Sequence, residues 1–227
     1  MDLQHNKMIT SEDIYVDLCL KIEKLEYMPG TRLSENELCK CYGVTRHVVR
    51  NALTSLKQRR LVEVYPQRGT YVSLIDMKYI GDILYLRESV EQEALCRIME
   101  MEDRSEVVGR LRQALEAQRD LPRGINYSDE FYAIDNIFHE SLLDAIDKPN
   151  VTKLISDPYI HIRRWRNFEI RTEARMQEIM EEHEKIIQSI EAGNAKMGRE
   201  WLHLHLDTVG RYFKPLKEQE AQYFVAE

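Results

Sequence analysis

Four side chains in the C-terminal half of the sequence could bind one metal ion. Asp135 and His139 are four residues apart, so both lie on one face if the segment is helical. His183 and His205 fall in two later segments that also have helical periodicity. Three imidazoles and one carboxylate suit a divalent metal ion. The alternative is that each histidine is an ordinary surface or core residue, because spacing alone gives no geometry.

His203 competes with His205 for the fourth ligand position. The two histidines are two residues apart and cannot share one face of a helix. The core-facing stripe of this segment consists of Leu202, Leu206, Val209 and Phe213. His205 flanks that stripe and His203 lies farther from it, so we predict that His205 is the ligand.

The second group of notable residues is basic and lies between positions 40 and 72. This stretch holds seven basic residues and one acid, although the whole chain has a formal net charge of −7. Residues 1–73 contain 11 Lys or Arg and 9 Asp or Glu, so that part carries +2 and the remainder −9. A local basic patch of this kind is what contact with phosphate groups requires.

Three helices followed by a hairpin are predicted around this patch. Ser34 and Glu37 form a capping box for the second helix, and Thr45 can cap the third. After that helix the apolar period becomes strand-like, and a turn over 66–69 joins two strands. The predicted elements are helices over 9–26, 34–40 and 45–59 and strands over 61–65 and 70–72. This order is that of a winged helix-turn-helix, whose recognition helix enters the major groove of DNA.

The candidate DNA contacts lie at the start of the third helix and at the hairpin tip. Arginine can pair with guanine or grip a phosphate, and a helix N-terminus offers N–H donors to a phosphate. A basic tip suits the minor groove or the backbone, and a glycine there lets the tip approach closely. The candidates are Thr45, Arg46, His47, Arg50, Arg68 and Gly69. The alternative is a small helical domain whose arginines only face solvent.

The remainder of the chain is predicted to be all-helical. Strand patterns stop after Ser73, and residues 76–214 indicate roughly six helices, with breaks near 103, 121–124, 148–149, 168–173 and 193–194. The fold class is therefore mostly α, a winged helix-turn-helix followed by an antiparallel helical bundle. The predicted parts are a DNA-binding domain at 1–73, a linker at 74–77, a sensing domain at 78–214 and a tail at 215–227. The apolar cluster Tyr223-Phe224-Val225 could pack on the body of the chain or on a partner subunit.

Composition excludes several classes of protein. Apolar residues make up 43% of the chain and glycine plus proline only 15 residues, so a disordered or fibrous chain is excluded. No apolar run reaches the roughly 18 residues that span a membrane, and the N-terminus is too polar for a signal peptide. We therefore expect a cytoplasmic protein with no membrane partner. No C-x-x-C pair occurs, and we expect reduced, structural thiols at Cys19, Cys39, Cys41 and Cys96.

The motifs of residues 10–73 resemble the GntR family of regulators. They are Pro29-Gly30-x-Arg32-Leu33-Ser34-Glu35, Gly43-Val44-Thr45-Arg46, Val49-Arg50-x-Ala52-Leu53, Leu61-Val62 and Arg68-Gly69-x-x-Val72. His47-Val48 stands where the family often has Thr-Pro, and Asn51 where Glu is usual, so we expect His47 to alter the base preference. The resemblance adds Arg32 to the candidate DNA contacts. It implies a homodimer that binds double-stranded DNA at a short palindromic operator.

Residues 78–214 resemble the FCD ligand-binding domain of the FadR-like branch of that family. The motifs are Asp135-x-x-Phe138-His139, Lys148-Pro149-Asn150, Glu182-His183, Ile190-Glu191-Ala192-Gly193-Asn194 and His205-Leu206. The resemblance implies a divalent metal held by Asp135, His139, His183 and His205. Zinc is the first choice, and nickel, manganese and iron also accept such ligands. Some members lack the histidines and bind acyl-CoA, and the complete set here argues against that ligand.

The resemblance also implies a small carboxylate effector that completes the metal coordination. Arg87, in Leu86-Arg87-x-x-x-Glu91, matches an arginine of the first sensing helix and could clamp a carboxylate. A surface ion pair with Glu91 is the open alternative. Asn150 is a second candidate effector contact, and Arg163 and Arg164 are weaker ones.

The expected function is therefore a DNA-binding transcription regulator, with a repressor as the family-level expectation, whose DNA affinity an effector controls. One alternative is a regulator that responds to the metal ion itself. The other is a metal-dependent enzyme, which the absence of an H-E-x-x-H motif disfavours.

Overall fold

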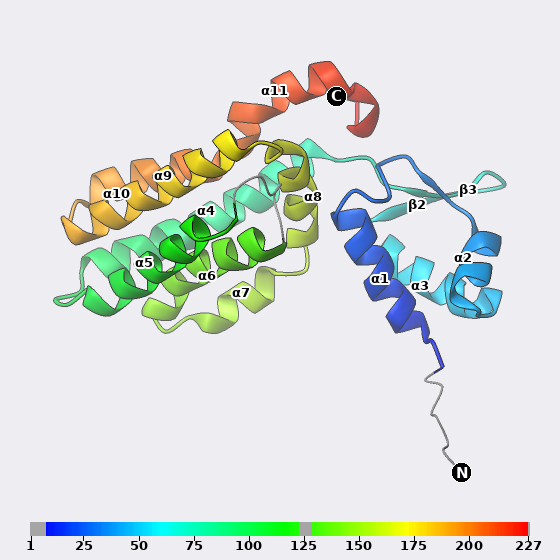
Figure 1. Cartoon of the computed structure of the whole chain (residues 1–227), viewed down its shortest axis with the longest axis horizontal. Helices are drawn as coiled ribbons and strands as arrows, with labels where there is room; N and C mark the ends of the chain where they lie inside the picture. The colour runs from blue at the N-terminus through cyan, green and yellow to red at the C-terminus, as the bar shows by residue number, and fades with distance from the viewer. Residues whose placement is uncertain (1–7, 123–128, 227) are drawn as a thin grey trace, which may run out of the picture. The chain divides into compact units, whose positions relative to one another are not determined.

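The computed structural model describes residues 8–122 and 129–226 of the chain (Figure 1). These residues divide into two compact units. The first unit holds residues up to Asp76 together with the segment from Glu220 onward, and the second holds Met77–Gln219. No helix in the described part of the chain is long and apolar enough to cross a membrane.

The first unit is a winged helix-turn-helix, as the sequence predicts. Its elements are α1 (Ser11–Glu23), β1 (Arg32–Leu33), α2 (Glu35–Tyr42), α3 (Arg46–Gln58), β2 (Val62–Tyr65) and β3 (Gly69–Val72). The Ser34 hydroxyl accepts a hydrogen bond from the Glu37 N–H, which is half of the predicted capping box. The helix α2 ends at Gly43, whose φ of 66° is left-handed and costs glycine little.

The sheet of this unit has one strand more than the predicted hairpin. The strand β1 pairs antiparallel with β3, so the strand order is β1-β3-β2. Leu33 pairs with Thr70, and Val62 pairs with Val72 on the other side of β3. The sequence pattern missed β1 because two residues are too few to show an alternation of apolar and polar side chains.

The core of the first unit fixes the orientation of α3. The helices α1 and α3 pack together, and their buried residues include Ile14, Leu18, Val49 and Leu56. Since the apolar face of α3 is buried against α1, its basic face is exposed to solvent. The packing therefore leaves the predicted recognition face free.

The C-terminal segment belongs to this first unit. Phe224 forms a parallel bridge with Ile75, and both side chains are buried. The Ile75 N–H donates to the Tyr223 carbonyl over 2.9 Å, and the Val225 N–H donates to the Ile75 carbonyl over 3.0 Å. Of the two placements that the sequence leaves open, the apolar cluster of the tail packs on the chain itself.

The second unit is a helical bundle, again as predicted. Within its described residues it has eight helices: α4 (Met77–Met99), α5 (Ser105–Arg119), α6 (Asp129–Ala145), α7 (Pro149–Ile155), α8 (Tyr159–Glu169), α9 (Glu173–Glu191), α10 (Ala195–Leu206) and α11 (Thr208–Glu220). The two helices beyond the expected six arise from breaks near Ser156 and at Asp207, where no proline–glycine pair marks a turn. Residues 123 and 124 of the break predicted at 121–124 lie outside the described residues. The helix α11 runs on through Pro215.

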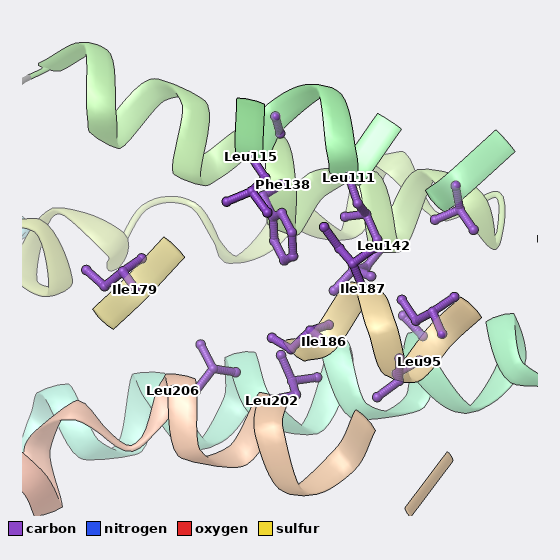
Figure 2. Packing of buried hydrophobic residues seen from close by; sticks show 14 of the residues in the cluster. Leu95, Leu111, Leu115, Phe138, Leu142, Ile179, Ile186, Ile187, Leu202 and Leu206 are labelled. Carbon is purple, nitrogen blue, oxygen red and sulfur yellow. The ribbon is translucent and has the colours of Figure 1, made fainter. Parts of the chain in front are cut away.

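The core of the bundle brings its long helices together. The helix α9 packs against α5 and α10, and α4 packs against α6 and α10. Figure 2 shows side chains of this core that interdigitate between the helices: Leu95, Leu111, Leu115, Phe138, Leu142, Ile179, Ile186, Ile187, Leu202 and Leu206. Burying one such side chain contributes about 1.5–3 kcal/mol, so the packing holds the polar residues between these helices in fixed positions.

Candidate metal centre

The structure brings the four predicted metal ligands together inside the bundle. Asp135 and His139 come from α6, His183 from α9 and His205 from α10, and all four side chains are buried. One ligand atom of each residue lies within 4.8 Å of those of the others. His205 is fully buried, whereas His203 is exposed and pairs with Glu88, as its position off the core stripe requires.

Each of the three histidines has one ring nitrogen bonded away from the centre of the group. The bonds join Nδ1 of His139 to Glu91 Oε2 (2.6 Å), Nδ1 of His183 to Gln118 Oε1 (2.9 Å) and Nδ1 of His205 to Glu182 Oε2 (3.0 Å). When the Nδ1–H donates outward, the tautomer is set and the Nε2 lone pair faces inward. Metal-binding histidines are held by partners of this kind.

The inward-facing atoms have the spacing of metal ligands. Nε2 of His139 lies 3.1 Å from Nε2 of His205, and Nε2 of His183 lies 3.5 Å from Oδ1 of Asp135. Two ligands each about 2.1 Å from a metal are about 3.0 Å apart at a right angle and about 3.4 Å apart at the tetrahedral angle. The observed separations therefore fit ligands that share one ion.

Two inward-facing atoms are buried polar atoms without a hydrogen bond. Among the described residues, neither Nε2 of His183 nor Oδ1 of Asp135 has a hydrogen-bond partner. A buried polar atom left unsatisfied costs about 1–3 kcal/mol. A divalent cation would satisfy both atoms at once, so this donor set fits a metal ion.

Burial keeps two of the histidines, His183 and His205, in the neutral form that can bind a cation. Burial, reinforced by the neighbouring His205, lowers the pKa of His183 well below its ordinary value. Burial also lowers the pKa of His205 to about 4, although its hydrogen bond with Glu182 opposes this shift. For Asp135, burial alone would raise the pKa, but the guanidinium of Arg166 lowers it below its ordinary value. Two imidazoles are therefore neutral and the carboxyl is ionised at pH 7, which are the forms that bind metals.

A cavity of about 100 Å³ lies next to the metal-ligand group, and His139 belongs to both. Its charged and aromatic lining residues are Arg87, Glu91, Tyr132, Glu140, Tyr159 and Arg163. Such a volume exceeds what several water molecules need, so it has room for a small organic acid. The candidate site therefore consists of four possible metal-binding side chains and an adjacent cavity, which share His139.

Arg87 forms the ion pair with Glu91 that the sequence leaves open, but the pair is buried, and a role in binding an effector stays a prediction. It lines the cavity, and its Nε also donates to Glu91 Oε1 over 2.7 Å. That ion pair is buried within the bundle and does not lie on the surface. Because Glu91 also bonds His139, one carboxylate connects the cavity arginine to a predicted metal ligand.

The remaining candidate effector contacts differ in position. Arg163 lines the cavity and donates to the Tyr132 hydroxyl over 3.1 Å. Arg164 is buried, which lowers its pKa to about 10, and it is absent from the cavity lining. Asn150 is exposed in the first turn of α7 and does not line the cavity.

The candidate DNA contacts gather on the exposed side of the first unit. Thr45 precedes α3 as its N-cap residue, but its side chain makes no cap hydrogen bond, contrary to the prediction, and its hydroxyl is therefore available to a phosphate. Arg46 donates to Asn36 over 2.8 Å, and Arg50 pairs with Glu35 over 3.0 Å. The exposed residues of the set are Arg32, Thr45, Arg46, His47, Arg50 and Arg68.

The wing tip depends on a glycine. Gly69 has a φ of 113°, a region that residues with a side chain rarely adopt. A Cβ at this position would lie 3.2 Å from Arg32 Nε, so the glycine lets Arg32 pass close to the tip.

The roles of several residues at the site were missed by reasoning from the sequence, although Glu91 and Glu182 appear in the quoted motifs. Glu91, Gln118 and Glu182 hold the three imidazoles, and Tyr132 and Tyr159 line the cavity. The helical spacing of Glu91 from Arg87 and of Tyr132 from Asp135 offered a weak signal. Nothing in the sequence pattern pairs Gln118 with a histidine 65 residues away.

Glu91→Gln is expected to weaken zinc binding about 10- to 100-fold, because loss of a partner of a metal-binding histidine costs about this much. The substitution removes the charge that orients His139 and leaves the side-chain volume nearly unchanged. Glu93→Gln is the matched control, since Glu93 lies on the same helix in an exposed pair with Arg97. Competition with a chromophoric chelator measures both affinities. Equal zinc affinity in the two variants would contradict the role of Glu91.

A winged helix-turn-helix followed by a separate helical domain is the architecture of a DNA-binding regulator. Residues 10–72 match the family described as bacterial regulatory proteins, gntR family, and residues 82–208 match the FCD domain. The chain therefore belongs to the GntR family of transcription regulators and carries an FCD domain. Its family and relatives are transcription regulators and not enzymes.

Individual relatives align with nearly the whole length of this chain. An HTH-type transcriptional regulator encoded in an unstable DNA locus of Streptomyces ambofaciens is 30% identical over 99% of this chain and 93% of its own length. The HTH-type transcriptional repressor RspR of Escherichia coli is 24% identical over 96% and 94%. The crystal structure of a GntR regulator from Rhodococcus has a TM-score of 0.63 at 21% identity and covers 94% of this chain and 96% of that one, which shows the shared fold.

Proposed function

We propose that this GntR regulator binds a divalent metal, with zinc as the first choice, through Asp135, His139, His183 and His205. We propose further that a small carboxylate, bound at that metal and in the adjoining cavity, controls its affinity for operator DNA. The observation that carries this proposal is the convergence of one ring nitrogen from each of the three histidines and one carboxylate oxygen of Asp135 within 4.8 Å of one another. Outward partners hold all three rings in that orientation.

The charges around the cavity favour an anion only when a metal is present. The two arginines of the lining, Arg87 and Arg163, are matched by the two carboxylates of Glu91 and Glu140. A bound divalent ion would supply net positive charge and open coordination positions beside the cavity. Arg87 would then orient the effector carboxylate with its planar guanidinium. Metal and carboxylate should therefore act together.

The DNA-binding step is assigned to the exposed face of α3 and to the wing. Arg46 and Arg50 would exchange their present partners, Asn36 and Glu35, for base edges or phosphates. We propose a homodimer that places two such faces on a palindromic operator, as is usual for helix-turn-helix dimers. Repression is the proposed sign of regulation, supported by the name of the Escherichia coli relative.

The experiment uses a DNA duplex selected from a random pool by the wild-type protein. Fluorescence anisotropy then gives its affinity for the zinc-loaded protein with and without lactate, gluconate or citrate. A change of about fivefold or more with one of these acids is expected, since allosteric couplings span about 5- to 150-fold. Absence of any response to acids overturns the carboxylate proposal. If chelation alone changes the DNA affinity by that amount, the metal ion itself is the signal.

A further inference from the structure

The C-terminal segment contains a buried residue, Phe224, that packs within the first unit of the chain. Phe224 is 3% exposed and Ile75 is 2% exposed, whereas the neighbouring Val225 is 43% exposed. Two backbone hydrogen bonds, from Ile75 to Tyr223 and from Val225 to Ile75, flank the buried ring. The segment is therefore held by both its backbone and one apolar side chain.

Ile75 occupies a particular place in the chain. It follows β3, which ends at Val72 and forms the wing, and it precedes α4, which begins at Met77. The same helix α4 carries Arg87 and Glu91 of the sensing site. We call the contact of Phe224 with Ile75 the clasp. The clasp thus lies on the linker that joins the wing to the sensing helices.

The other end of the segment, α11, is anchored on the sensing helices. The Arg211 guanidinium donates to Glu182 Oε1 over 2.5 Å and to the Leu204 carbonyl over 3.0 Å. The Tyr212 hydroxyl donates to Glu178 over 2.8 Å, so a second bond joins α11 to α9. Both contacts lie in the first turns of α11, before the chain leaves the bundle.

Glu182 connects this anchor to the metal-ligand group. Its Oε2 accepts the hydrogen bond from Nδ1 of His205, and its Oε1 accepts the bond from Arg211. One carboxylate therefore holds a proposed metal ligand and the start of α11 at the same time. A change in the orientation of His205 would be passed to Arg211 through a side chain with little freedom to absorb it, since Glu182 is buried.

We propose that the segment from Thr208 to Phe224 is a second connection between the sensing helices and the DNA-binding unit, in parallel with the linker. In this proposal, a change in the orientation of His205 on metal and effector binding shifts Glu182 and Arg211. The shift of Arg211 moves α11 and so alters the contact of Phe224 with Ile75. This inference rests on the proposed function of the site. An effector can act by this route only if it binds the two arrangements of the segment with different affinity.

Two variants break the clasp and one leaves it intact. Phe224→Ala removes the buried ring, and deletion of residues 220–227 removes the whole clasping segment. Val225→Ala is the matched control, because it shortens the exposed neighbour and keeps the backbone bonds. The readout is the ratio of dissociation constants for the selected DNA, measured by anisotropy with chelator-treated protein and with protein given zinc plus lactate, gluconate or citrate. Zinc affinity is measured in parallel.

We expect a ratio of about fivefold or more, in either direction, for the wild type and for Val225→Ala. The ratio should fall to within twofold of unity in both clasp variants, while their zinc affinity stays unchanged. A wild-type ratio in Phe224→Ala or in the deletion variant overturns the role of the segment and leaves the proposed function standing. Loss of DNA binding by both variants in every condition means that the clasp is only structural, which also overturns it. A ratio of unity in the wild type overturns the proposed function and the inference together.

Discussion

His205→Ala is expected to lower the zinc affinity of the protein by at least about a hundredfold, since even loss of a partner behind a metal ligand costs about 10- to 100-fold. His205 is fully buried, and its Nε2 lies 3.1 Å from that of His139. His203, the nearest histidine along the chain, cannot replace it, because His203 is exposed and bonds Glu88. The response of DNA binding to carboxylates should disappear with the metal.

His203→Ala is the matched control for this prediction. It removes the same side chain from the same helix, but from the solvent-exposed face. We expect its zinc affinity and metal content to equal those of the wild type, as measured by chelator competition and by elemental analysis. The assignment of His205 would be contradicted if both variants lost zinc equally, or if neither did.

Arg46→Ala is expected to weaken binding to the selected DNA about 10- to 100-fold, because an arginine that reads a base edge contributes about 1–3 kcal/mol. Arg46 is the first residue of α3 and is exposed, with a single hydrogen bond to Asn36. The N-terminal residues of a recognition helix are those that reach base edges. Zinc affinity should not change, because Arg46 belongs to the first unit.

Arg97→Ala is the control for the loss of one positive charge. Arg97 is exposed on α4 and forms an ordinary surface pair with Glu93. Its removal should change the DNA affinity less than about twofold. An exposed ion pair contributes little to stability, and salt screens an exposed charge beyond about 10 Å. Anisotropy titrations at two salt concentrations separate a base contact from a phosphate contact, because only the phosphate contact reduces the salt slope. Equal DNA affinity of the two variants would contradict the role of Arg46.

The sequence was most informative where the periodicity of apolar and polar residues within one helix determines which side chains are buried. Asp135 and His139 share a face because they are one helical turn apart, and His205 is buried because it flanks the stripe that contains Leu202 and Leu206. The basic face of α3 is exposed for the same reason, since its opposite face is apolar. In these cases the helical period determines which side chains are buried and which are exposed. Burial then separates the possible metal ligands from the residues that can contact DNA.

Features that depend on contacts between distant segments could not be predicted in this way. The bond from His183 to Gln118 joins α9 to α5, and the strand β1 exists because β3 offers it an edge. The clasp between Phe224 and Ile75 joins residues 149 positions apart. Periodicity records what one segment does, whereas these contacts are decided by how several segments pack.

Native mass spectrometry of the purified wild-type protein can show directly whether a metal ion and a small acid bind to the chain. The protein is prepared with zinc and a mixture of lactate, gluconate and citrate, and is then sprayed from a volatile buffer. We expect each chain to carry the extra mass of one divalent ion and one small acid, and His205→Ala to carry neither. A wild-type protein that shows only the mass of the bare chain under these conditions would contradict the account.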